Sequence, residues 1–281
     1  MSQLRRMTAF TTSPRGGNPA GVWIGDALPT EPEMQRIAAE TGYPNTAFLA
    51  PAQGHDRIVR YFSPAVPVGF CGHATIASGV ILGQTLGAGT YRFSTPTGEV
   101  PVAVREHDGQ WEVSLTSVLP KHEPAMPDLV AGVLDALEWS AGDLDESIPP
   151  ARIYAGNWHL ALAARTADRL ADLDYDFDGL RAVMSGAGLT TLQLVWRERG
   201  DLYHSRNPFP VGGVVEDPAS GSAAAAFAGY LRDARLIEAP ASIVILQGEA
   251  MGRPSRIEVE IPRTGGIVVT GRAVAMEDEA N

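Results

Sequence analysis

The chain is poor in cysteine, in positive charge and in long apolar runs. One cysteine among 281 residues excludes an internal disulfide and is typical of a reducing compartment. Acidic residues outnumber lysine and arginine by 33 to 22, and this excess disfavours nucleic acid and anionic membranes as partners. Apolar runs are too short to cross a bilayer, and no apolar segment follows the N-terminal arginines as in a secretory signal. We therefore predict a soluble cytoplasmic protein.

Several kinds of chemistry have no sequence support. The histidines show no HxxxH or HxH spacing and a single cysteine makes no zinc site, so we predict no metal. There is no Walker A pattern and no strand–GxGxxG–helix unit, so nucleotide binding has no support and we expect no cofactor. Ser222 lies in SGSAA rather than in a GxSxG turn, which argues against a hydrolase triad.

Glycine and proline are abundant, with 30 and 21 residues, and they predict many short strands and few helices. The Pro-rich passage 117–128 predicts a connection between domains, and the acidic tail 276–281 predicts disorder. The predicted helices cover 31–41, 71–87, 177–186 and 222–235. The predicted strands are 5–10, 20–24, 46–50, 57–63, 90–95, 98–106, 110–116, 151–155, 158–164, 190–197, 199–206, 242–247, 255–262 and 267–275.

Two segments of the sequence resemble each other. Residues 62–80 and residues 209–230 each contain a proline, a Gly/Val stretch, a short polar turn and then a helix of small residues. A helix enclosed by strands needs small side chains, because other backbones must approach it closely. We infer two similar halves, each a curved sheet around a central helix, with the two polar turns facing each other across a cleft. The alternative is that two buried helices merely share an alanine-rich composition.

The polar turns are named here the first helix start, residues 71–74, and the second helix start, residues 216–222. Unpaired N–H groups and the helix dipole favour an anion at such a position. Acid, imidazole and thiol together at paired helix starts indicate acid–base chemistry. Each group also has an ordinary alternative as a cap residue, a core histidine or a small buried side chain. The candidates are Cys71, His73, Glu216, Asp217 and Ser222.

Six motifs, in order along nearly the whole chain, resemble the PhzF family of phenazine biosynthesis, within the diaminopimelate epimerase-like superfamily. This resemblance implies an isomerase without a cofactor, and usually a homodimer. The type reaction of the family shifts a proton within a small cyclic carboxylic acid, dihydro-hydroxyanthranilate. The motifs are GNPAGV (17–22), TAFL (46–49), RYFSP (60–64), CGHAT (71–75), GVVEDPASGSAA (213–224) and LQGEAMGRPS (246–255).

The resemblance also implies an α+β, diaminopimelate epimerase-like fold with two pseudo-symmetric domains, each a barrel-like sheet around a central helix. On this basis we expect an N-terminal domain of residues 1–118, completed by residues 265–277 near the end of the chain. The C-terminal domain then covers residues 119–264.

Individual residues match the family's active-site positions. The catalytic positions are those of Asp217, His73 and Cys71. Cys71 lies where epimerase relatives place a catalytic cysteine, although members of the PhzF type can carry alanine there. The substrate-binding positions are those of Asn18, Asn45, Gly72, Ala74, Gly221 and Ser222.

The chain departs from the family pattern at Asn45. Family isomerases carry a glutamate there as the proton carrier, and asparagine cannot act as acid or base. A second departure is Pro67, where relatives often place an acidic residue.

Three hypotheses about function follow from these departures. The first is an isomerase or epimerase that uses Cys71, Asp217 and His73. The second is a catalytically impaired binding protein, and the third is an isomerase whose substrate replaces the missing group. A thiol at a helix start loses its proton more readily. Because Asp217 and His73 are both present, the sequence favours an isomerase.

Overall fold

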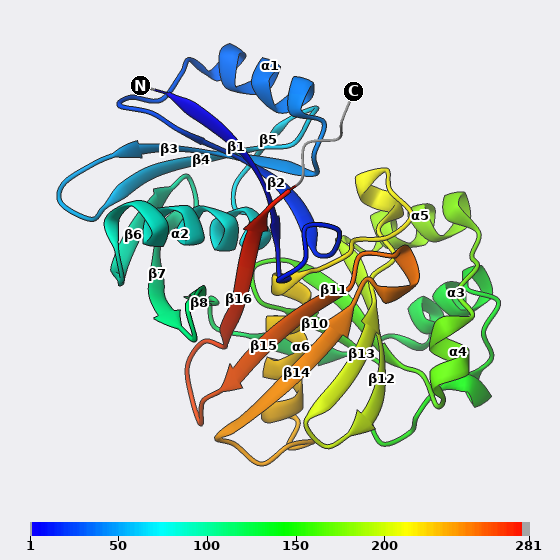
Figure 1. The fold of residues 1–281 in the computed structure, drawn as a ribbon. Helices are drawn as coiled ribbons and strands as arrows, with labels where there is room; N and C mark the ends of the chain where they lie inside the picture. The colour runs from blue at the N-terminus through cyan, green and yellow to red at the C-terminus, as the bar shows by residue number, and fades with distance from the viewer. Residues whose placement is uncertain (1, 277–281) are drawn as a thin grey trace. The chain divides into compact units, whose positions relative to one another are not determined.

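The computed structural model describes residues 2–276, which form two units (Figure 1). Among the described residues, the first unit comprises residues 2–116 and 270–276, and the second comprises Ser117–Val269. The last strand, β16 (Val268–Ala275), therefore belongs mostly to the first unit. The acidic tail 276–281 was predicted to be disordered. Only its first residue, Met276, belongs to the described residues.

The first unit is a closed eight-stranded barrel. Its sheet runs in the order β1-β2-β3-β4-β6-β7-β8-β16, and the antiparallel pairing of β16 with β1 closes it. The pairs β2–β3 and β4–β6 are parallel. The short β5 (Pro67–Val68) pairs with β4. The other strands are β1 (Gln3–Ala9), β2 (Asn18–Ile24), β3 (Asn45–Pro51), β4 (Arg57–Phe62), β6 (Gly89–Thr95), β7 (Gly98–His107) and β8 (Gln110–Thr116).

The helix α2 (Gly72–Leu86) occupies the centre of this barrel. Residues 73–83 are all buried, and the helix packs against β1, β2, β3, β7 and β8. Glycine is needed on this helix because a Cβ at Gly79 would lie 2.6 Å from the Val113 side chain. The small-residue composition therefore reflects close packing, as the sequence predicted. A second helix, α1 (Glu31–Thr41), covers β3 and β4 from outside with Met34 and Ala38.

The second unit repeats this plan. Its strands follow the order β15-β14-β13-β12-β11-β10-β9, and the pairs β11–β12 and β13–β14 are parallel. From β10 to β15 the pairing alternates between antiparallel and parallel as it does from β1 to β7, which confirms the inferred repeat. The strands are β9 (Lys121–Pro124), β10 (Ala151–Tyr154), β11 (Trp158–Ala163), β12 (Thr191–Arg199), β13 (Leu202–Arg206), β14 (Ala241–Gln247) and β15 (Ser255–Ile261).

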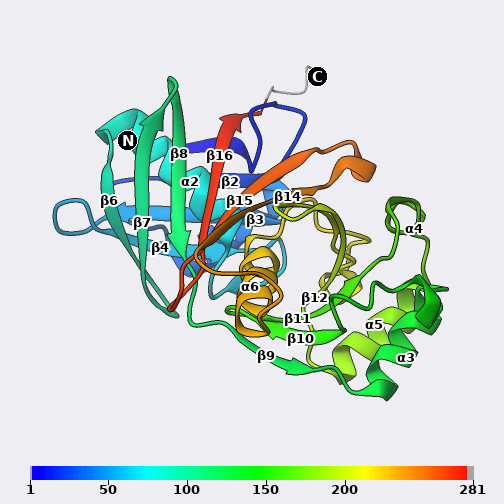
Figure 2. The same cartoon turned by 90° about the horizontal axis from the view of Figure 1, so that it is seen from below.

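The central helix of the second unit is α6 (Gly221–Asp233). It packs against β9, β10, β11, β12 and β15, and Figure 2 shows it beside β10 and β11. In each unit the central helix connects two parallel strands, β4 to β6 and β13 to β14, because such strands need a crossover connection. The expected architecture, two barrel-like sheets that each enclose a helix, is thus confirmed.

Three further helices, α3 (Pro127–Ala136), α4 (Ala167–Ala171) and α5 (Phe177–Gly186), form an outer layer of the second unit (Figure 2). The helices α3 and α5 bury Leu134, Leu180 and Met184 against the outer face of β11 and β12. The helix α3 was not predicted from the sequence, and residues 117–128 were expected to form a connection between domains. The structure instead places β9 and the first turn of α3 in that passage, with Pro127 in the first helical turn, where proline is tolerated.

Within residues 2–276, no helix combines the length and the apolar character needed to cross a bilayer.

Candidate active site

The first helix start lies at the N-terminus of α2. Cys71 is its N-cap in an extended conformation, and no side chain caps the helix. Among the described residues, the amide N–H groups of Gly72, His73 and Ala74 have no acceptor. The Thr75 hydroxyl donates to the Cys71 carbonyl at 2.7 Å and fixes the backbone at this point. The helix therefore begins with three unused donors and the positive end of its dipole.

A thiol and an imidazole lie together at this first helix start. The Sγ of Cys71 is 3.4 Å from Nδ1 of His73, and both side chains are buried. Burial lowers the pKa of His73 from 6.5 to about 4. The imidazole is therefore neutral near neutral pH, and a neutral imidazole can accept the proton of an adjacent thiol.

Asn18 and Asn45 lie at the same end of the barrel as the first helix start. They begin the parallel strands β2 and β3, where Ala20 pairs with Asn45. The hydroxyl of Tyr61, on the next strand, donates to Thr75 in the first turns of α2 at 2.6 Å. The Oδ1 of Asn45 is buried and has no hydrogen-bond partner in the described part of the chain. The first unit thus gathers all its predicted site residues at one end.

The second helix start lies at the N-terminus of α6. Ser220 is the N-cap, and its Oγ accepts from the Ala223 N–H at 3.4 Å. The amides of Gly221 and Ser222 have no acceptor among residues 2–276. Asp217 is half-buried three residues before the cap, and its N–H donates to the Asn207 carbonyl at 3.0 Å. The predicted residues of the second unit therefore also lie together.

A buried polar network, which the sequence analysis did not predict, supports the second helix start. Nδ1 of His159 lies 2.8 Å from the Thr191 hydroxyl, and its Nε2 lies 3.4 Å from Oγ of Ser222. The Asn207 amide donates to Thr191 at 3.3 Å and to Oε1 of Gln193 at 2.9 Å. The sequence does contain a signal for this network, because it places polar side chains on apolar strands such as WHLALA. A polar side chain that is buried on such a strand normally has a hydrogen-bond partner.

The two buried histidines predict a pH dependence of stability. Burial lowers the pKa of His159 from 6.5 to about 3 and that of His73 to about 4. Below pH 6.5 the unfolded chain therefore binds protons that the folded chain does not, and the free energy of unfolding falls as the pH falls. Well below pH 6.5 and above its folded pKa, each histidine contributes a limiting slope of about 1.4 kcal/mol per pH unit.

Urea unfolding of the wild type and of His159→Asn between pH 7 and about pH 5 measures this slope. The variant is expected to show a shallower decline, because one of the two buried imidazoles is gone. An unchanged slope would contradict the assignment of His159 as a buried neutral group.

The structure assigns Glu216 a structural contact rather than a free carboxylate. Its carboxylate receives a bidentate contact from Arg206, with Nη2 to Oε2 at 2.7 Å and Nε to Oε1 at 3.1 Å. Glu216 is 5% exposed. The Tyr175 hydroxyl donates to the neighbouring Val215 carbonyl, and burial, together with the Glu216 charge, raises the pKa of Tyr175 to about 12. Glu216 is therefore engaged in an ion pair and is a weak candidate for proton transfer.

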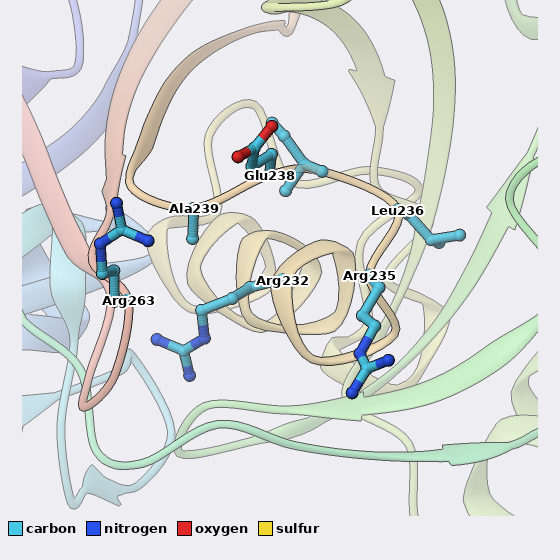
Figure 3. A pocket seen from close by; sticks show the side chains of 7 residues that line it. Arg232, Arg235, Leu236, Glu238, Ala239 and Arg263 are labelled. Carbon is cyan, nitrogen blue, oxygen red and sulfur yellow. The ribbon is translucent and has the colours of Figure 1, made fainter.

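A hollow of about 470 Å³ lies at the other end of α6 (Figure 3). Its arginines point in different directions, and Arg232 donates to the carbonyls of Pro262 and Gly265. The helix extends about 18 Å between Gly221 and this end, where the dipole is negative and favours arginine side chains. This hollow is therefore separate from the second helix start. Within residues 2–276 no three His, Cys, Asp or Glu side chains gather where they could hold a metal ion.

The closed barrel of the first unit and the matching sheet of the second, each enclosing a helix, define a diaminopimelate epimerase-like fold. Residues 7–279 match the model of the family described as phenazine biosynthesis-like protein, PhzC-PhzF. The chain belongs to this family.

Individual relatives agree with this assignment. An uncharacterized isomerase of Bacillus subtilis, YfhB, is 30% identical over 98% of this chain and 97% of its own. The trans-2,3-dihydro-3-hydroxyanthranilate isomerase of Pseudomonas aeruginosa is 30% identical over 96% of this chain and 95% of its own. A crystal structure of a Bacillus anthracis PhzF-family protein superposes with a TM-score of 0.85 over 99% of this chain and 98% of that one, at 22% identity. The protein is an isomerase.

Proposed function

We propose that this isomerase moves a proton on a small carboxylic acid by acid–base catalysis, without a cofactor. The observation that carries the proposal is that both central helices begin with unused amide donors beside groups that can exchange protons. These groups are Cys71 and His73 in one unit and Asp217 in the other. Donors of this kind suit a substrate carboxylate or an enolate that forms during proton transfer.

In this proposal the proton leaves one carbon of the substrate and returns to another position or to the other face. The Asp217 carboxylate or the Cys71 thiolate takes the proton, and the conjugate acid of the other group returns one. The neutral His73 imidazole accepts the thiol proton when Cys71 acts as the base. Each proton that an enzyme group takes from the substrate is matched by one that another enzyme group returns to it. The scheme therefore needs no oxidant and no cofactor.

Asn45 has a binding role in this scheme. An amide cannot carry the proton that a glutamate carries, but its Oδ1 can accept a hydrogen bond from a substrate hydroxyl or amine. The buried Oδ1 has no partner among the described residues, and an unpaired polar atom of this kind is costly unless a ligand satisfies it. We propose that Asn18, Asn45, Gly72, Ala74, Gly221 and Ser222 bind the substrate.

Replacing Cys71 by alanine tests the thiol. We expect the Cys71→Ala variant to lose about 10²-fold in turnover, at the low end for a general acid or base, while it stays folded. Solvent deuterium exchange into the substrate and the thermal unfolding midpoint measure the two quantities. Activity equal to that of the wild type would show that Cys71 is a small core residue and would exclude the thiol from the mechanism.

The alternative is a catalytically impaired member that binds a small carboxylic acid, and it rests on Asn45. A binding protein of this kind would exchange no proton with any acid in a panel of small carboxylic acids. It would still gain thermal stability when one of these acids binds. The name of the Pseudomonas aeruginosa relative makes trans-2,3-dihydro-3-hydroxyanthranilate the first member of that panel. Other cyclic acids and amino acids complete it.

A further inference from the structure

The motif LQGEAMGRPS covers residues 246–255. It forms the turn between β14 and β15, with Gln247 paired to Ser255 across the strands. Gln247 is 1% exposed, and its side chain points back to the chain segment that precedes α6. Its Nε2 donates to the Asp217 carbonyl at 2.6 Å, and its Oε1 accepts from the Ser220 N–H at 3.3 Å. One amide group thus connects both ends of the segment 217–220.

The turn is shaped to bring Gln247 to this segment. Gly248 has a φ of +76°, which side-chain-bearing residues rarely adopt. A Cβ at this position would also lie 2.7 Å from the Pro218 carbonyl oxygen. The carbonyl of Gly248 in turn accepts from the Arg253 N–H at 3.0 Å and closes the turn. The glycine therefore allows the turn to pack directly against the backbone of Pro218.

Gln247 binds the carbonyl of Asp217, and the partner of this carbonyl determines where α6 begins. In a helix that started one turn earlier, the Asp217 carbonyl would accept from the Gly221 N–H. Here that carbonyl accepts from Gln247 instead, and the Gly221 amide has no acceptor among the described residues. The Asp217 N–H is held at the same time by the Asn207 carbonyl at 3.0 Å. Asp217 is therefore fixed through both of its backbone polar groups, by two different strand ends.

We propose that Gln247 is a positioning residue for the isomerase reaction. It holds the backbone of Asp217 so that the carboxylate keeps its place, and it prevents α6 from extending backwards over the amides of Gly221 and Ser222. This inference rests on the proposed function of Asp217. A misplaced catalytic group of this kind costs turnover more than it costs binding.

The test compares Gln247→Met with Gln247→Glu. Methionine has nearly the same length but forms neither hydrogen bond, so kcat is expected to fall by tenfold or more, up to about 10²-fold, at every pH. A buried carboxyl stays protonated to a higher pH than an exposed one, and in that form it can make both hydrogen bonds. Gln247→Glu is therefore expected to retain kcat at low pH and to lose it as the introduced carboxyl ionises. The wild type lacks this loss.

Tyr230→Phe is the matched control. It removes a 2.8 Å hydrogen bond from a buried side chain to the Pro149 carbonyl in the same unit, away from Asp217. It is expected to lower stability and leave kcat unchanged. If Gln247→Met behaves as Tyr230→Phe does, with lower stability and wild-type kcat, Gln247 is merely structural and the inference is overturned.

Failure of the proposed function is recognised separately, because the wild type then turns over no acid of the panel. Amide hydrogen exchange over residues 217–222 still decides the positioning in that case. Faster exchange of the Ser220 amide in Gln247→Met is expected. Unchanged exchange would show that Gln247 does not hold this segment.

Discussion

Asp217→Asn is expected to lose about 10³- to 10⁴-fold in turnover while its unfolding midpoint stays close to that of the wild type. The amide has the same shape as the carboxylate but neither takes nor gives a proton near neutral pH. The backbone contacts of Asp217, its N–H to Asn207 and its carbonyl to Gln247, do not involve the carboxylate and persist in the variant. The expected loss is therefore one of chemistry rather than of folding.

The matched control for this prediction is Asp174→Asn. Asp174 is an exposed aspartate of the same unit, outside both helix starts, and its replacement changes the net charge by the same amount. Turnover of Asp174→Asn should equal that of the wild type. If Asp217→Asn retains full turnover, the carboxylate carries no proton, and if it melts at a much lower temperature, the residue is structural.

Glu216→Gln is expected to destabilise the protein by about 3–5 kcal/mol, because it leaves the guanidinium of Arg206 without its buried counter-charge. The Glu216 side chain is 3% exposed and that of Arg206 is 15% exposed, so water has little access to the lost contact. The pair also closes the hairpin in which Pro208 bridges to Glu216, directly before Asp217. Turnover should therefore fall together with stability. Equilibrium urea unfolding measures the first effect.

The double variant Arg206→Met with Glu216→Leu removes both charges and keeps apolar volume at the site. It is expected to recover most of the stability that Glu216→Gln loses, since buried pairs are often replaceable by apolar side chains. The single variants Arg206→Met and Glu216→Leu are measured alongside it. A double variant whose loss of stability equals the sum of these two single losses would contradict this interpretation. Wild-type stability in Glu216→Gln would show that the pair contributes little.

The central helices and most strands were predictable, because local composition dictates them. The alanine and glycine stretches of α2 and α6 signal helices that other backbones approach, and Gly79 meets Val113 as that reasoning requires. The start of α3 was not predictable, because Met126 offers no side-chain cap and the surrounding prolines resemble a linker. The tertiary contacts of Leu134 with the outer core stabilise that helix instead.

The candidate site was predictable only where it is local in sequence. Cys71 and His73 are two residues apart, so their contact at a helix start follows from the motif itself. The contact of His159 with Ser222 spans 63 residues and the contact of Gln247 with Asp217 spans 30, and neither follows from local pattern. Such contacts depend on which strand ends the barrel brings together.

Solvent exchange tests the central claim most directly. The wild type is incubated in D₂O with the panel of carboxylic acids, trans-2,3-dihydro-3-hydroxyanthranilate included, and mass spectrometry follows deuterium gain or a new isomer. The account predicts enzyme-dependent deuterium gain in at least one acid, and its loss in Asp217→Asn. No exchange in any acid, together with thermal stabilisation by one of them, would contradict the account and identify a binding protein that lacks its catalyst at Asn45.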